Sequence, residues 1–300
     1  MHVAIFLWGF TGILGRLIEL QEGLLVWYRM LITIVALFAL IKYNGEYKKI
    51  TWKEFKSVGF VGALIAIHWV TFYGAIKYSN ISIALSCFSS TALFTAFIEP
   101  FMNKRRISKA EIFFGLVTIA GIYLIFHFQK LYATGIILAL ISSALCSVFT
   151  IKNKDLVGTH SPGNLLFYEL LSGIGILTVL MPFYLWAFPT DRYFPDASDW
   201  LYLAILSLAC TVFALRISYK ALQKVTPFTM NLSVNLEPVY GIILAFLVFH
   251  EEKDLNAGFY AGTSLIILSV VVHSLFRFRS ARNERKLKKA YSCFTQFLNR

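Results

Sequence analysis

Charged side chains are scarce in this sequence. Asp, Glu, Lys and Arg make up 15% of the 300 residues, hydrophobic residues make up 58%, and the mean hydropathy is +0.67. A water-soluble domain of this length could not cover its surface with so few charges. The composition therefore excludes a soluble globular protein and favours a chain whose solvent is lipid.

Residue types that carry catalysis or bind metals are also sparse. The four cysteines, Cys87, Cys146, Cys210 and Cys293, lie far apart, which argues against a disulfide framework or a metal site. No Walker A phosphate loop occurs, so ATP is not the direct energy source within this chain. All five aspartates lie between apolar stretches and form no DxxD pair with a basic clamp, which disfavours a membrane-embedded transferase. We expect no enzymatic activity, no cofactor and no metal.

What the sequence does contain is a series of apolar stretches. A hydrocarbon core of roughly 30 Å needs about 20 apolar residues per helix, so the chain has room for about ten spans. The stretches run approximately over residues 3–18, 23–41, 57–76, 80–102, 110–127, 133–151, 164–188, 199–220, 226–249 and 256–276. We predict an all-α integral membrane protein with ten transmembrane helices. The first stretch lacks a basic leader and a small-residue cleavage site, so we do not expect a cleaved signal peptide.

Basic residues alternate between the connections. Lys48 and Lys49 follow the second stretch and Arg105 and Arg106 the fourth, whereas connections of the other parity carry acidic residues such as Asp196. Basic loops face the cytoplasm in most membrane proteins. Because the C-terminal tail is basic and the number of spans is even, we expect both termini in the cytoplasm and the protein in the cell membrane.

The tail, residues 278–300, is predicted to be a basic amphipathic segment. Its apolar residues recur at helical spacing: Leu287, Tyr291, Phe294 and Leu298. Such a segment suits anionic lipid headgroups, and we expect lipid rather than nucleic acid as its partner.

Two segments of the sequence align with each other. Phe72-Tyr73-Gly74-Ala75 before the fourth stretch resembles Ser218-Tyr219-Lys220-Ala221 before the ninth, which places Tyr73 opposite Tyr219. Upstream, a second match places Arg29 opposite Glu169. A unit of five helices thus occurs twice, over residues 1–130 and 131–277. Because five is odd, the second copy enters the membrane from the opposite side, and an inverted repeat is typical of alternating access.

These residues resemble the EamA-type branch of the drug/metabolite transporter superfamily. The resemblance rests on Leu7-Trp8-Gly9, on Trp27-Tyr28-Arg29, and most specifically on residues 235–241, Asn-Leu-Glu-Pro-Val-Tyr-Gly, with Glu251 closing the ninth span. The first repeat departs from the pattern, with Ser90-Thr91-Ala92 where the family has its proline and Glu99-Pro100 eight residues later. The resemblance implies ten helices around a central cavity and export of amino acids, related metabolites or drugs.

The leading hypothesis is therefore a secondary transporter for a small solute. An amino acid or an amphipathic compound fits an aromatic-rich cavity, and a homodimer stays open as an oligomeric state. A passive facilitator or a lipid scramblase is the alternative that the sequence does not separate from an exporter.

Polar residues inside the spans are the candidates for substrate binding, because each is costly in lipid without a partner or a wet cavity. Glu237 falls halfway along the ninth span, and Pro238 leaves the carbonyl of Val234 without its helical donor. The complete candidate set is Trp8, Thr11, His68, Trp69, Tyr73, Ser86, Ser90, Asn231, Asn235 and Glu237. Packing of small and amide side chains is the alternative for the serines, and a satisfied packing residue is the alternative for His68. Proton coupling through Glu237 or His68 is a further hypothesis.

Four charged residues near helix ends are candidates for gating or coupling: Arg29, Glu99, Glu169 and Arg216. Arg29 lies about 9 Å inside one face at 1.5 Å per residue, and Glu169 lies close to the other, so we expect no direct pair between them. Structural ion pairs or snorkelling to the interface explain Glu99 and Arg216 equally well.

Overall fold

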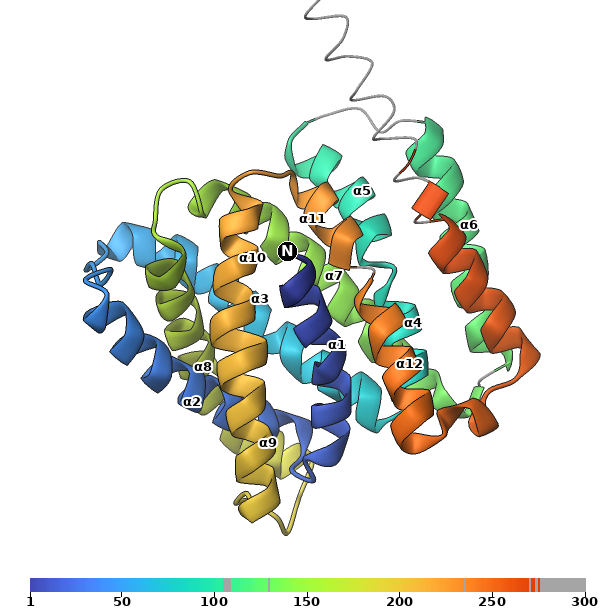
Figure 1. Ribbon diagram of the computed structural model, residues 1–300, viewed down its shortest axis with the longest axis horizontal. Coiled ribbons are helices and arrows are strands. Elements are labelled where there is room, and N and C mark those ends of the chain that lie inside the picture. Colours follow the sequence, from blue (N-terminus) through green and yellow to red (C-terminus); the bar gives the residue numbers. More distant parts are fainter. Residues whose placement is uncertain (105–108, 129, 235, 270, 273–274, 276–300) are drawn as a thin grey trace, which may run out of the picture.

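The computed structural model describes residues 1–275 apart from 105–108, 129, 235, 270 and 273–274, and in that part of the chain helices are joined by turns and loops, without β-strands (Figure 1). The α-helices are α1 (His2–Leu17), α2 (Glu22–Tyr43), α3 (Trp52–Lys77), α4 (Ile81–Phe88), α5 (Thr91–Met102), α6 (Lys109–Phe128), α7 (Ala133–Leu156), α8 (Pro162–Ala187), α9 (Ala197–Ser207), α10 (Ala214–Leu222), α11 (Pro227–Val234) and α12 (Glu237–Phe249). A π-helical segment, Leu208–Phe213, joins α9 to α10, and an apolar helix, Ala257–Ser269, follows α12. The predicted amphipathic tail lies outside the described residues.

Six helical segments of the described chain are long and apolar enough to cross a membrane: Glu22–Tyr43, Trp52–Lys77, Ile81–Met102, Ala133–Leu156, Pro162–Ala187 and Ala197–Leu222. Four shorter apolar helices accompany them, including α1 and α12. The prediction of an all-helical, multi-pass membrane protein is confirmed at this level.

Local sequence sets several helix starts. Thr51 and Glu54 form a reciprocal capping box at the start of α3, and the Asn80 side chain accepts the Ile83 N–H at 2.8 Å at the start of α4. Ser161 caps α8, whose first residue is Pro162. Each side chain satisfies a backbone N–H that has no partner within its helix, and a proline at the first position needs none.

Two apolar stretches that we predicted as single helices are interrupted in their middle. The chain breaks before Glu237, where Pro238 cannot donate to the preceding turn. The equivalent break in the first half lies at Ser89 and Ser90, without any proline. There the hydroxyls bond backward, from Ser89 to the Leu85 carbonyl at 3.1 Å and from Ser90 to the Cys87 carbonyl at 2.7 Å. Serine hydroxyls that compete for carbonyls in this way bend or end helices.

Glycine allows the central helices to touch through their backbones. A Cβ added to Gly62 on α3 would lie 2.0 Å from the carbonyl oxygen of Glu169 on α8. At the edge of the bundle (Figure 1), α6 and the helix Ala257–Ser269 meet in the same way, with Gly121 against Gly262. Small residues at such crossings are the usual packing device of helices in lipid, where the hydrophobic effect does not drive helices together.

The contacts between helices define two ends of the bundle. α1 runs parallel to α12, because Gly9 meets Gly241 and, further along, Arg16 meets Glu251. We call the end where α1 begins the Met1 side; α2, α7 and α10 finish there and α11 begins there. The opposite end, the Lys77 side, holds the ends of α1, α3 and α12. In Figure 1 the Met1 side is the upper one.

Candidate functional site

A cavity lies between the two halves of the chain. The space between its walls, counted together with the open solvent at its mouth, is about 750 Å³. Its wall combines aromatic rings with polar side chains: Trp8, Thr11, Arg29, His68, Trp69, Phe72, Phe88, Phe149, Thr150, Asn153, Ser218, Tyr219, Asn231 and Glu237. Asn153 and Leu222 come from the last turns of α7 and α10, and Met230 comes from the start of α11. The cavity therefore extends from the middle of the bundle toward the Met1 side.

Arg29 on α2 is held in place by the first half and the π-helical segment. Its Nη1 donates to the Tyr73 hydroxyl at 2.7 Å and its Nε to Thr211 Oγ1 at 3.0 Å. The guanidinium carbon lies 3.8 Å from the centre of the Trp69 ring, a cation–π arrangement. A buried arginine is thus accommodated by hydroxyls and a ring, and it stiffens this end of the cavity wall.

Glu237 faces the cavity without such partners. It is 5% exposed and begins α12, where the first N–H groups of a helix favour a negative charge. Within the described part of the chain its carboxylate makes no hydrogen bond and no ion pair. It is a carboxyl group that a solute could contact, enclosed by aromatic walls.

His68 on α3 is fixed through one ring nitrogen. Its Nδ1 lies 3.0 Å from the Ser142 carbonyl oxygen and 2.8 Å from the Ser142 hydroxyl, which donates to the His68 carbonyl at 3.1 Å. The ring centre lies 5.6 Å from that of Phe88 and 5.3 Å from that of Phe149. The His68 ring is held by Ser142, as expected for a satisfied packing residue, and it also lines the cavity, as expected for a residue that contacts solute.

The structure separates the candidate binding residues into two groups. Trp8, Thr11, His68, Trp69, Asn231 and Glu237 line the cavity. Tyr73, Ser86 and Ser90 do not: Tyr73 is fully buried behind Arg29, Ser86 accepts from Thr263 at 3.1 Å, and Ser90 bonds to its own helix. Asn235 lies outside the described residues.

The candidate gating residues occupy different places. Arg216 on α10 pairs with Glu46 at 2.6 Å, and Glu99 lies on α5, away from the cavity wall. Glu169 is fully buried and accepts a hydrogen bond from the Tyr219 hydroxyl at 2.6 Å. Arg29 and Glu169 thus each bond to the tyrosine of their own half rather than to each other.

Sequence reasoning missed one wall of the cavity. Phe149, Thr150 and Asn153 of α7 and Ser218 of α10 line it. The alignment of Tyr219 with Tyr73 was the signal that could have drawn attention to α10. Small and polar residues also recur along α7 at helical spacing, at Ser143, Ser147, Thr150 and Asn153, and this pattern was a second available signal.

The profile of the EamA-like transporter family matches residues 1–127 and 133–275. The chain belongs to the EamA-like transporter family. It is a membrane transporter, and the resemblance seen in the sequence is confirmed.

Relatives of this EamA-like transporter include two uncharacterized transporters. That of Archaeoglobus fulgidus is 25% identical over 248 residues, covering 79% of this chain and 82% of that protein. That of Clostridium kluyveri is 22% identical over 287 residues, covering 90% and 89%. A solved crystal structure shares the fold at 15% identity, with a TM-score of 0.66 over 92% of this chain and 95% of that one.

On the Lys77 side of the transporter, a buried carboxylate ties three helices together. The Glu251 side chain, 1% exposed, accepts from the Ile81 N–H at 3.0 Å, the Ser82 N–H at 2.8 Å and the Ser82 hydroxyl at 2.6 Å, and it pairs with Arg16. We call these four residues the Glu251 cluster. Because Glu251 follows α12, Arg16 ends α1 and Ile81 begins α4, the cluster joins the two halves of the chain.

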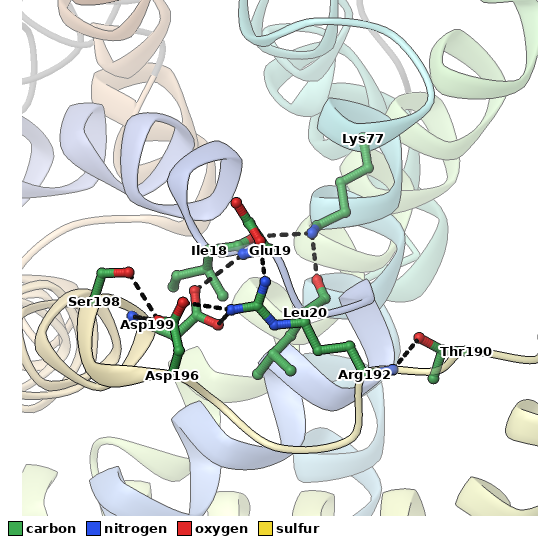
Figure 2. Close-up of polar contacts among 9 residues, drawn as sticks. All are labelled: Ile18, Glu19, Leu20, Lys77, Thr190, Arg192, Asp196, Ser198 and Asp199. Carbon is green, nitrogen blue, oxygen red and sulfur yellow. Dashed lines mark hydrogen bonds and ion pairs between the residues drawn. The ribbon is translucent and has the colours of Figure 1, made fainter.

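A second group of charges lies on the same side, in the loops (Figure 2). Arg192 contacts Glu19 as well as Asp196 at 2.7 Å and Asp199 at 2.9 Å, and the Glu19 N–H donates to Asp199 at 3.1 Å. Lys77 donates to the carbonyls of Ile18 and Leu20. The backbone N–H of Asp199, then the Ser198 hydroxyl and Arg192, lower the pKa of Asp196 below its usual range. These residues, the Arg192 cluster, link the α1–α2 connection to the start of α9 on the Lys77 side.

Proposed function

We propose that this chain is a secondary transporter that exports a small metabolite, such as an amino acid or an amphipathic compound, by alternating access. The observation that carries the proposal is a central cavity that extends to the Met1 side while the Glu251 and Arg192 clusters close the Lys77 side. Rocking of one half against the other would open these clusters and close the Met1 side. The protein needs no covalent chemistry for this function.

We further propose ten membrane crossings in two inverted units, residues 1–130 and 131–277, with the four shorter apolar helices also crossing. Equivalent contacts support the repeat. In the first unit Arg29 on the second predicted span bonds Tyr73 on the third, and in the second unit Glu169 bonds Tyr219 at the aligned positions. The family match also falls into two segments, 1–127 and 133–275.

The chemistry of the cavity favours a solute that carries an amino group and an apolar part. Glu237 offers an unpaired carboxylate, and the rings of Trp8 and Trp69 offer faces for a cation or a flat apolar group. Arg29 gives its hydrogen bonds to Tyr73 and Thr211, and its charge also interacts with Glu237 through space.

For orientation, we propose that both termini lie in the cytoplasm of a cell with the protein in its cell membrane. The Met1 side then faces the cytoplasm, so the cavity is loaded from inside, as export requires. A fluorescent protein fused after Arg300 should fluoresce, and alkaline phosphatase inserted at Asp196 should be active. The reverse pattern would contradict this orientation.

Comparative metabolite profiling tests the function itself. Cells that lack the protein should accumulate the solute inside, and cells that overproduce it should enrich the medium. Purified protein in proteoliposomes should then move that solute against a gradient, which a passive facilitator or a lipid scramblase would not do. Glu237→Gln should raise the KM for an amine-bearing solute; an unchanged KM would remove Glu237 from the binding site.

A further inference from the structure

A second buried carboxylate lies behind the cavity wall, apart from the proposed solute contacts. Glu169 on α8 has an exposed fraction of 0%. Its Oε2 accepts the Tyr219 hydroxyl at 2.6 Å, and that hydroxyl accepts from Asn153 Nδ2 at 2.8 Å. Its Oε1 is shielded from solvent and has no hydrogen-bond donor within the described part of the chain. The carboxyl group is thus satisfied on one side alone.

The neighbouring amide is unsatisfied in a complementary way. Asn153 Oδ1 is also buried without a donor, and the Asn153 side chain lies within hydrogen-bond reach of the Glu169 carboxyl. Each of these buried oxygens lacks a donor, which is unfavourable. A proton on Oε1 removes the charge from the Glu169 carboxyl, which lowers the cost of burying it.

Among the described residues of the helices packed around Glu169, no cationic side chain pairs with its carboxyl group. α3 presents Gly62 against the Glu169 backbone, and α2 packs on α8 through Met30 and Ile41. The titratable groups that face the site are the Tyr219 hydroxyl from α10 and, behind it, the Cys146 thiol from α7. An ionised Glu169 would therefore be a buried charge without a counter-ion.

The cations along α7 and α10 do not pair with Glu169. Lys152 and Lys220, next to Asn153 and Tyr219, are exposed. Lys154 donates to the Leu222 carbonyl at 2.7 Å and the Gln223 carbonyl at 3.2 Å, and Arg216 pairs with Glu46 at 2.6 Å. Burial without a counter-ion therefore favours the neutral form of the carboxyl in this conformation.

We propose that Glu169, Tyr219 and Asn153 form a proton-binding site that couples solute movement to proton movement; this rests on the transport function proposed above. Tyr219 and Asn153 both line the cavity, so Glu169 lies one side chain behind it. On release the O–H bond at Oε1 breaks, the proton passes to a water molecule in the cavity, and the carboxylate keeps the electron pair. The aligned position in the first half is Arg29, so the first repeat has no carboxyl group at the equivalent place.

Infrared difference spectroscopy of the purified full-length protein tests the site without any solute. We expect a buried protonated-carboxyl band at neutral pH that Glu169→Gln removes and Asp155→Asn leaves in place. Asp155 is exposed on the same helix as Asn153 and is the matched carboxylate-to-amide control. Tyr219→Phe retains the carboxyl and should change the pH at which the band disappears. An identical band in the wild type and in Glu169→Gln, or an unchanged pH dependence in Tyr219→Phe, would overturn the proposal.

Proteoliposomes with a tritiated amino-acid mixture as the probe test the coupling. Gln at position 169 has the same shape and can accept from Tyr219, so Glu169→Gln should fold and exchange labelled for unlabelled solute. Its accumulation driven by an imposed pH gradient should fall to background. Accumulation with wild-type pH dependence in this variant would overturn the coupling. If the wild type neither exchanges nor accumulates the probe, the proposed solute class fails, while the infrared band still decides the proton site.

Discussion

Replacing Glu251 by Gln perturbs the closure of the Lys77 side with a minimal change of shape. The carboxylate, 1% exposed, holds two N–H groups at the start of α4, the Ser82 hydroxyl and Arg16. Gln retains one acceptor oxygen but places an NH₂ group among donors. The variant therefore removes the charge, at least one hydrogen bond and the favourable interaction with the α4 N-terminus.

The size of the effect follows from these contacts. A hydrogen bond to a charged group contributes about 1.5–3 kcal/mol, and removing one partner of a buried ion pair costs about 3–5 kcal/mol. The Arg16 side chain is 38% exposed, so water screens much of its electrostatic interaction with Glu251. We expect a loss of about 3 kcal/mol in the conformation closed on the Lys77 side, which shifts a two-state equilibrium roughly a hundredfold toward opening.

Thiol labelling measures this shift. Thr11 is 4% exposed and lines the cavity, so Thr11→Cys, with the native cysteines replaced by Ser, reports solvent access to the cavity. A membrane-impermeant maleimide is applied from the Lys77 side. Its labelling rate should rise by roughly the population shift when Glu251→Gln is added, because only the conformation open to that side admits the reagent.

The neighbouring carboxylate provides the control. Glu252 has a 38% exposed side chain and lies 3.6 Å from His250, outside the Glu251 cluster. Glu252→Gln should leave the labelling rate unchanged. If Glu251→Gln labels no faster than this control, the Glu251 cluster does not hold the Lys77 side closed and the alternating-access argument loses its main structural support.

Two further predictions concern stability, each read from thermal unfolding of the purified protein in detergent. Gly62→Ala should destabilise the protein by about 1–3 kcal/mol or more, because its Cβ would lie 2.0 Å from the Glu169 carbonyl oxygen. The control Gly175→Ala has open space around it and should be neutral or stabilising. Equal melting temperatures of the two variants would contradict the backbone contact. The pKa of Asp196 is lowered in the folded protein, first by the backbone N–H of Asp199. The contribution of Asp196 to folding stability is therefore present above the unfolded-state pKa of about 3.9 and is lost as the pH falls through the lower folded-state pKa. Asp196→Asn should flatten the acid dependence of the melting temperature; a parallel curve would refute this.

The sequence by itself determined the solvent, the helical class and the family. Sparse charge and long apolar runs leave a helical bundle in lipid as the consistent solution, because each backbone N–H and C=O in lipid must be bonded within the protein. It also marked Pro238 as the residue that leaves the Val234 carbonyl without a donor, although it predicted one uninterrupted helix there. The alignment set Arg29 opposite Glu169 and Tyr73 opposite Tyr219, and the structure adds what the alignment did not predict, a hydrogen bond from each charged residue to the tyrosine of its own half.

The tertiary structure alone decided which polar side chains reach the cavity. Ser86 and Ser90 share their spacing with residues of a binding face. In the structure Ser86 accepts a hydrogen bond from Thr263, and Ser90, in the break between α4 and α5, bonds back to the Cys87 carbonyl. A contact such as that of Ser86 with Thr263, between residues far apart in the chain, depends on how the helices pack and not on sequence spacing. In lipid the outer face and the packed face of a helix are both apolar, so hydrophobic periodicity, the main signal in soluble proteins, does not tell them apart.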